Sequence, residues 1–429
     1  MTSTDPLESA SPHRMRTAWL VVALLIPVAL LNYLDRQMLA SMKFSVMHDI
    51  GSVGQGGVDP RPLTEADWGT ILALFKWVYA FLSPIGGYLA DRYSRRHVIT
   101  GSLFVWSLVT FMTGMVQTYE ELLFTRALMG ISEACYIPAA LALIADYHVG
   151  DTRSRAVGLH QMGIYAGVII GGFSGYAADD PTLGWRWAFY GCGIVGIAYS
   201  LPLFFLLRNP PRSQTAIPDG SRPSALAAVR ELSGNGSFIL LVLYFTLPAM
   251  AGWVVRDWMP AILKKEFDIS QGLAGVSATL YWQVAAIFGA VFGGWLADRW
   301  MRKTRRGRIY VSAIGVSLIV PAIFGVGFSP LTQQLWVAVA FLILFGLGWG
   351  FFDGNNMPIL CQIVRPELRA TGYGIMNLVS ISCGGLADWG VGILSDRNVP
   401  LSGICGIVAC AAILSVVLVL LIRPREILA

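Results

Sequence analysis

The chain has 429 residues, of which 55% are hydrophobic and only 13% are charged, about half the charged fraction of a typical soluble protein. So much apolar surface excludes an ordinary soluble fold and requires lipid. The net charge of +5 does not indicate a nucleic-acid partner, because the basic residues lie in short clusters between apolar runs and not on one face.

Twelve apolar stretches are long enough to cross a membrane, since a spanning helix needs about 20 largely apolar residues. The first six lie at residues 17–42, 66–90, 97–117, 121–147, 154–178 and 186–207. The second six lie at residues 236–263, 272–298, 308–328, 333–360, 368–394 and 402–423. The sequence therefore predicts an all-α membrane protein with two six-helix domains, 1–207 and 236–429, joined by a polar linker at 208–235.

The distribution of Lys and Arg predicts how the chain sits in the membrane. Of 31 basic residues, 21 lie in segments on the side of the two termini and six lie in segments on the other side. Cytoplasmic segments carry the excess of Lys and Arg, so we expect a cytoplasmic-membrane protein with both termini in the cytoplasm. The remaining four lie within the spans and are candidates for function: Arg36, Lys76, Arg126 and Arg256.

An internal repeat supports the division into two halves. Gly-Gly-Tyr-Leu-Ala-Asp-Arg at residues 86–92 recurs as Gly-Gly-Trp-Leu-Ala-Asp-Arg at residues 293–299, a shift of 207 residues. Parallel repeats of this kind place a substrate site at their interface near mid-membrane.

The chain shows no pattern of an enzyme, a metal site or a disulfide framework. Its six cysteines fall inside apolar stretches, and none of its five histidines has a His or Cys partner at helical spacing. No nucleophile–base pair or nucleotide-binding loop is recognisable. We expect no enzymatic activity and no cofactor, with the proton as the coupling ion.

Three motifs resemble the major facilitator superfamily, and the resemblance covers essentially the whole chain. The signature loop reads Gly-Tyr-Leu-Ala-Asp-Arg-Tyr-Ser-Arg-Arg at residues 87–96, with Ser94 where the family usually has Gly. Arg-Ala-Leu-Met-Gly at 126–130 and Gly-Trp-Arg-Trp-Ala-Phe at 184–189 resemble the family's fourth helix and its entry to the sixth. The resemblance implies the major facilitator fold and secondary active transport.

Two branches of that superfamily share the motifs on the first and fourth helices, Asn-Tyr-Leu-Asp-Arg at 32–36 and Arg126 through Glu133-Ala134. One branch is the anion:cation symporters, which carry sugar acids and other organic anions with protons. The other is the Spinster-like transporters, linked to lysolipids and sphingolipids. Residues 133–138 are more similar to the Spinster-like branch, whereas Arg256 is similar to arginines of organic-anion carriers; we favour the anion interpretation.

Charged residues inside a span are costly and mark a pathway or relay. Arg126 and Glu133 are seven residues apart, which places them on one helix face, roughly 10 Å apart along the axis. Asp35 and Arg126 are expected at similar depth. We hypothesise that Arg36 and Arg126 bind an anionic substrate, while Asp35 and Glu133 compete for these arginines and take up protons. The alternative is that the four form buried ion pairs that only hold helices together.

Other polar residues are weaker candidates, and for each of them helix packing is an alternative. The predicted substrate contacts are Tyr33, Tyr136, Gln161, Arg256, Asn355 and Asn356. The resemblance further implies a gating latch on the cytoplasmic side, formed by Asp91, Arg92, Asp298 and Arg299, where a signal for orientation alone is the alternative. Glycines at four-residue spacing, Gly163 to Gly175, predict close helix packing.

The sequence thus predicts a monomeric transporter in the lipid bilayer that moves a small organic anion, such as a sugar acid or other carboxylate, by proton-coupled symport and alternating access. A transporter of lysolipids or other amphiphiles, or of a neutral sugar, is the alternative. A membrane-embedded enzyme or sensor fits least well, since no soluble domain is predicted.

Overall fold

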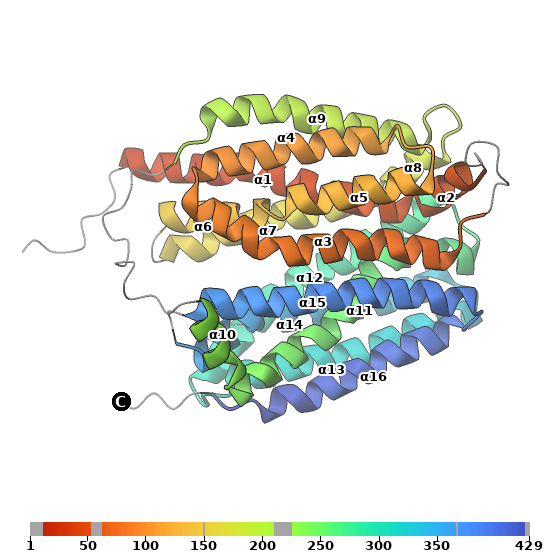
Figure 1. Cartoon of the computed structure of the whole chain (residues 1–429). Helices are drawn as coiled ribbons and strands as arrows, with labels where there is room; N and C mark the ends of the chain where they lie inside the picture. The colour runs from red at the N-terminus through yellow and green to blue at the C-terminus, as the bar shows by residue number, and fades with distance from the viewer. Residues whose placement is uncertain (1–11, 53–61, 149–150, 210–224, 366–367, 425–429) are drawn as a thin grey trace, which may run out of the picture.

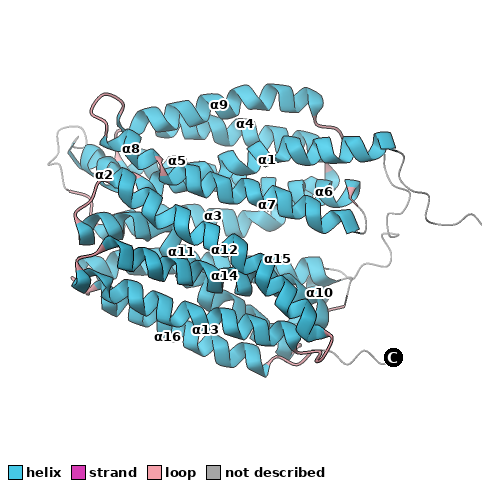
Figure 2. Cartoon of the chain, turned by 180° about the vertical axis from the view of Figure 1, so that it is seen from behind, coloured by secondary structure: helices cyan, strands magenta, loops and turns pink. Residues whose placement is uncertain are grey.

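The computed structural model describes residues 12–52, 62–148, 151–209, 225–365 and 368–424 (Figure 1). Within these residues every regular element is a helix (Figure 2). Eleven helical segments are long and apolar enough to cross a membrane. The remaining predicted span corresponds to α4 (Arg95–Thr113), which has only 19 residues and begins with two arginines and a histidine. It packs beside its neighbours in the bundle, as the other spans do.

The helices fall into two groups that follow the chain order (Figure 1). The first group is α1 (Pro12–Ser41), α2 (Lys43–Ser52), α3 (Glu65–Arg92), α4, α5 (Tyr119–Glu133), α6 (Tyr136–Tyr147), α7 (Asp151–Gly172), α8 (Ser174–Asp179) and α9 (Gly184–Leu206). The second is α10 (Ala225–Ser233), α11 (Gly236–Phe267), α12 (Gln271–Met301), α13 (Gly307–Phe328), η2 (Ser329–Thr332), α14 (Leu335–Ile363), α15 (Arg369–Asp396) and α16 (Leu401–Leu421). We call these groups the first and the second bundle.

Two predicted spans are interrupted, and the predicted linker is partly helical. The stretch 121–147 forms α5 and α6 with a break at Ala134 and Cys135, and 154–178 forms α7 and α8 with a break at Phe173. Helix α10 lies within residues 208–235. The first described residues of α1 and the last after α16 lie on the same side of the molecule (Figure 1).

Each bundle has its own apolar core, and large aromatic side chains fill it. Trp106 and Tyr136 are buried in the first bundle, whereas Trp282 and Phe345 are buried in the second. The predicted packing role of the α7 glycines is confirmed, because a Cβ atom on Gly167 would lie 2.2 Å from the carbonyl oxygen of Leu30 on α1. Only glycine allows α1 and α7 to approach so closely.

At the end opposite the termini, hydrogen bonds connect the two bundles. In each of two places, an aspartate of one bundle caps the N-terminus of a helix of the other bundle. Asp179, the last residue of α8, accepts hydrogen bonds from the backbone nitrogens of Gln271 (3.2 Å) and Gly272 (2.8 Å) at the start of α12. Asp396, the last residue of α15, accepts from the first two backbone nitrogens of α3, at 2.9 and 2.8 Å. A helix N-terminus carries free N–H donors and partial positive charge, so both contacts stabilise the closed end.

Candidate functional site

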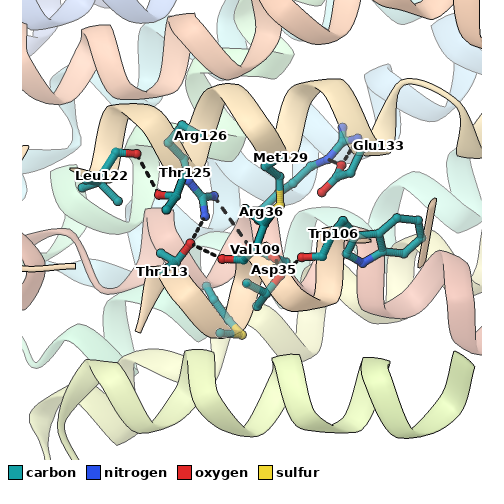
Figure 3. A network of polar contacts seen from close by, with 12 residues as sticks. Asp35, Arg36, Trp106, Val109, Thr113, Leu122, Thr125, Arg126, Met129 and Glu133 are labelled. Atoms are coloured by element: carbon teal, nitrogen blue, oxygen red, sulfur yellow. Dashed lines mark hydrogen bonds and ion pairs between the residues drawn. The ribbon is translucent and has the colours of Figure 1, made fainter. Parts of the chain in front are cut away.

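The four charged residues predicted on the first and fourth spans form two ion pairs between α1 and α5 (Figure 3). Arg36 contacts Glu133, with its Nη2 and Nε atoms 2.6 and 2.8 Å from Oε2. Arg126 contacts Asp35, with Nη1 3.7 Å from Oδ1. The structure therefore brings together all four residues that the sequence singled out.

The Asp35–Arg126 pair lies deep in the first bundle. Asp35 is 0% exposed and Arg126 is 2% exposed. The hydroxyl of Thr110 donates to Asp35. Arg126 Nη2 donates to the hydroxyl of Thr113 at 2.9 Å (Figure 3). Both threonines lie on α4, so this pair connects three helices. Arg126 borders a small side cavity, described below, and is not among the residues that line the larger cavity between the bundles.

Arg36 faces the space between the bundles. Its guanidinium lies over the rings of Tyr33, Phe75 and Tyr79, at 4.8, 4.7 and 4.9 Å from their centroids. Cation–π contacts of this kind hold a guanidinium in place without neutralising its charge. Its side chain is 11% exposed, while that of its partner Glu133 is fully buried.

A cavity of about 220 Å³ lies between the bundles. The first bundle contributes Tyr33, Arg36, Tyr79, Ile137, Leu141, His160, Gln161, Ile164 and Tyr165. The second contributes Phe245, Ala249, Gly252, Trp253, Arg256, Trp349, Asp353, Tyr373, Asn377, Ser380 and Ile381. Aromatic rings dominate the wall, and two arginines and one carboxylate provide its charges. Concave sites lined this way, with a few polar groups, are typical of small-molecule binding.

Arg256, on α11, is the basic residue that the second bundle contributes to this cavity. Its guanidinium lies over the rings of Trp253, Tyr33 and Trp282, at 5.1, 5.6 and 6.0 Å. Among the described residues, no carboxylate lies within 4 Å of it, and its Nε atom is buried without a hydrogen-bond partner. Arg256 is therefore a cation held in position by aromatic rings and available to an anion.

Three predicted substrate contacts lie outside the cavity. Tyr136 is buried in the core of the first bundle, where its hydroxyl donates to the carbonyl oxygen of Leu25 at 3.2 Å and contacts His160 Nε2 at 2.9 Å. Asn355 donates to the carbonyl oxygen of Phe351, and Asn356 is 2% exposed. Asp353 lines the cavity instead, because successive residues of a helix point about 100° apart.

A second charged cluster was not predicted. Lys76 on α3 forms ion pairs with Asp257 on α11 and with Asp388 on α15, and all three side chains are buried. Lys76 was recognised only as an isolated candidate and Asp388 was not recognised at all. A search for every charge within the spans would have found both. Their proximity could not be predicted, because 312 residues separate them in the sequence.

The described members of the predicted gating latch contact their own bundles. Arg92 Nη1 donates to the hydroxyl of Tyr88 at 3.1 Å, and Asp298 forms an ion pair with Arg308 at 2.7 Å. Arg299 lies 5.9 Å from the ring of Trp295. The side chain of Asp91 lies outside the described part of the structure. Among the described residues, no group of three His, Cys, Asp or Glu side chains is arranged to hold a metal ion.

Comparison with known proteins identifies similar sequences and folds. Residues 25–387 match the sequence pattern of the Major Facilitator Superfamily. Protein spinster homolog 1 of Bos taurus is 30% identical over 400 residues, covering 88% of this chain and 73% of its own length. The Homo sapiens protein of the same name is 28% identical over 403 residues, with the same coverage.

A solved structure shares the architecture. The crystal structure of a bacterial homolog of the human lysosomal transporter Spinster, in an inward-facing and unoccupied conformation, matches with a TM-score of 0.72 and 22% identity. The match covers 96% of both chains. At this identity the likeness concerns the fold alone, and it supports the major facilitator fold of two six-helix bundles.

Proposed function

Because this chain belongs to the Major Facilitator Superfamily and to its Spinster-like branch, we propose that it carries an organic anion across the membrane together with protons, by alternating access. The family makes the chain a multi-pass membrane transporter and not an enzyme. The anionic substrate and the coupling proton are inferred from the cavity and its neighbouring charges.

The unpaired guanidinium of Arg256 is the observation that carries the anion proposal. A half-buried cation without an ion pair is costly, and a substrate carboxylate or phosphate would supply a direct counter-ion, which Asp353 in the same cavity does not provide within 4 Å. The planar guanidinium can donate two parallel hydrogen bonds to such a group. Arg36, across the cavity, offers a second cation once its bond to Glu133 loosens.

The rest of the cavity wall suggests what the anion is attached to. Trp253, Trp349 and Tyr165 provide flat apolar surfaces, while Gln161 and Asn377 provide amide groups for hydroxyls. A volume of about 220 Å³ fits a compact solute. We therefore favour a small carboxylate with an apolar or hydroxylated body, of which a sugar acid is one example.

The proton proposal rests on the contact between Arg36 and Glu133. When a substrate anion draws the guanidinium of Arg36 towards the cavity, Glu133 loses its counter-ion in a dry environment and takes up a proton. Asp35 and Arg126 form a second carboxylate–arginine pair between the same two helices, α1 and α5, deeper in the bundle. A movement of these helices that separates Arg36 from Glu133 would also change the distance between Asp35 and Arg126. Substrate and proton then bind together, which is the requirement for symport.

A lysophospholipid is the second candidate substrate. It is favoured by the similarity to the Spinster proteins and by an apolar strip on the first bundle formed by Ile137, Leu141 and Ile164. In this case the phosphate would bind Arg256 and the acyl chain would lie along the strip.

We further propose that the protein lies in the cytoplasmic membrane as a monomer. The excess of basic residues on the side of the termini supports an orientation with both termini in the cytoplasm. In this orientation the caps made by Asp179 and Asp396 close the external side. Asp91, Arg92, Asp298 and Arg299 would form contacts between helix ends when the cytoplasmic side closes instead.

The test is uptake by the full-length protein in liposomes, with and without an inward proton gradient. The panel contains sugar acids, aromatic carboxylates, the corresponding neutral sugars and lysophospholipids. We expect gradient-stimulated uptake of a carboxylate, lost in Arg256→Gln and retained in Arg397→Gln, a matched change at an exposed arginine after α15. Uptake of neutral sugars alone would refute the anion proposal, and uptake of lysophospholipid alone would select the second candidate.

A further inference from the structure

The cluster of Lys76, Asp257 and Asp388 joins the two bundles outside the main cavity. The three residues are 3%, 6% and 0% exposed. Lys76 Nζ contacts the Oδ2 atoms of both aspartates and lies 4.5 Å from the ring of Trp253. Lys76 belongs to the first bundle and both aspartates belong to the second. Each ion pair therefore crosses the interface that must open during transport.

The charges of this cluster do not balance. One ammonium faces two carboxylates, so the cluster has a net charge of −1 when all three groups are ionised. A buried uncompensated charge is strongly unfavourable in a medium of low dielectric constant. In addition, Asp388 Oδ1 is buried, and the Trp258 indole is the further polar group that faces this carboxylate. One proton on the carboxylate pair would remove the net charge.

The charged groups around the cluster come from three further positions. A small cavity of about 30 Å³, enough for a water molecule, is lined by Lys76 and Asp257 together with Arg36, Arg126 and Arg256. Arg36 is paired with Glu133 and Arg126 with Asp35. Arg256 has no ion pair within 4 Å among the described residues, although Asp353 lines the main cavity with it, so Arg256 is the arginine whose charge most opposes protonation of the cluster. Arg256 also faces the main cavity, and the two cavities therefore share it.

The backbone contacts at this position show that the cluster must separate when the bundles part. A Cβ atom on Gly69 of α3 would lie 2.7 Å from the carbonyl oxygen of Asp388, and one on Gly392 of α15 would lie 2.4 Å from the carbonyl oxygen of Glu65. Helices α3 and α15 are thus in direct contact beside the ion pairs, on the side of the start of α3. Opening this end pulls Lys76 away from the aspartates and exposes all three groups to water.

We propose that the Lys76–Asp257–Asp388 cluster is a proton-binding site: the closed cluster holds one proton on its two carboxylates, and the separated carboxylates release it to water. The proton arrives from water as the end opposite the termini closes, forming one O–H bond on Asp388 or Asp257.

The shared arginine links this site to the substrate, and this step rests on the proposed function. A substrate anion bound to Arg256 neutralises the cation that opposes protonation of the cluster. Substrate binding therefore strengthens proton binding at the cluster, and by linkage the proton strengthens substrate binding. The cluster is distinct from Glu133, which responds to Arg36.

The experiment measures the conformation of the full-length protein without substrate. Spin labels are attached at Leu183, before α9, and at Leu331 in η2, two exposed positions on the end opposite the termini, in a background lacking the six native cysteines. Distances between the labels are recorded from pH 5 to pH 8. A site that binds one more proton when closed must shift the closed-to-open ratio towards closed as the pH falls, by up to about tenfold per pH unit.

The variants identify which group is responsible. Asp388→Asn removes the net charge, so we expect it to remain closed at all pH values. Asp268→Asn, the same change at an exposed residue after α11, should keep the pH response of the wild type. A wild-type distance distribution that does not change with pH overturns the proposal. It is also overturned if the pH response persists in Asp388→Asn and disappears in Glu133→Gln.

This measurement is independent of the uptake assay. No substrate is added, so the cluster can titrate even if organic anions are not transported. Conversely, the uptake assay can show transport that depends on Arg256 even if the distance between the spin labels does not change with pH. The two proposals therefore fail separately.

Discussion

Glu133 holds Arg36 through a single carboxylate oxygen: Oε2 lies 2.6 Å from Nη2 and 2.8 Å from Nε, while Oε1 is buried without a hydrogen-bond partner among the described residues. The contact uses one carboxylate oxygen, and a proton on this carboxylate would remove the negative charge that neutralises Arg36. Under the proposed symport, proton uptake by Glu133 and release of Arg36 therefore occur together.

Glu133→Gln should uncouple transport from protons. The amide keeps the shape of the side chain but cannot take up a proton, so we expect substrate exchange across the membrane to continue while stimulation by a proton gradient disappears. A one-unit pH gradient can drive about tenfold accumulation through a one-proton carrier, and this factor should fall to about one. Exchange and gradient-driven uptake are measured in the same liposomes. Glu266→Gln, at a partly exposed position on α11, serves as the control and should retain accumulation.

Asp353→Asn should improve the binding of anionic substrates. Asp353 lines the cavity with Arg36 and Arg256, and its negative charge repels a bound anion. Removing a repulsion on the order of 1 kcal/mol should lower KM about fivefold. The comparison is KM for a carboxylate against KM for its neutral amide, which should not change. An equal change in both would show that Asp353 acts on cavity shape and not on charge.

Asp179→Ala and Asp396→Ala should each favour opening of the end opposite the termini. Each carboxylate accepts two backbone hydrogen bonds at a helix start of the other bundle, and losing them costs about 1–2 kcal/mol. The open-to-closed ratio should rise about 5- to 30-fold, as measured by the distance between the spin labels. Asp180→Ala is the matched control, because Asp180 bonds only to its own loop at Thr182 and Leu183 in the described contacts. An equal shift in this control would contradict the capping role.

Gly167→Ala should destabilise the first bundle. Its new Cβ atom would lie 2.2 Å from the carbonyl oxygen of Leu30, so α1 and α7 must move apart. Overpacking of this kind costs about 1–3 kcal/mol. Thermal unfolding in detergent should therefore occur at a lower temperature than in the wild type. Gly158→Ala on the same helix meets nothing within 4 Å and should leave the unfolding temperature unchanged.

The architecture could be predicted from the sequence because it depends on local properties. Apolar stretches of about 20 residues located the spans, and the repeat at 86–92 and 293–299 identified the two halves. The breaks after Glu133 and at Phe173 were missed, since neither is marked by a proline at the break itself. The first interruption lies where α3 packs closely against it: a Cβ atom on Gly86 would lie 2.5 Å from the carbonyl oxygen of Ala134.

The site could be predicted only where its residues share a helix or a short motif. The seven-residue spacing of Arg126 and Glu133 was enough to place them on one face, near Asp35 and Arg36. The cavity lining was not predictable in the same way, because lipid-facing and cavity-facing positions in a span are both apolar. The ion pair between Lys76 and Asp388 depends on the arrangement of two helices from different bundles, which no local pattern specifies.

The caps made by Asp179 and Asp396 occupy equivalent places in the two halves, since each ends the fifth spanning segment of its bundle and binds the start of the second segment of the other. An interface with twofold symmetry makes every contact twice. A single six-helix chain paired with its own copy would therefore form both caps from one aspartate. The contact that closes this end can thus be older than the fusion of the two halves, and duplication would have preserved it without any new substitution.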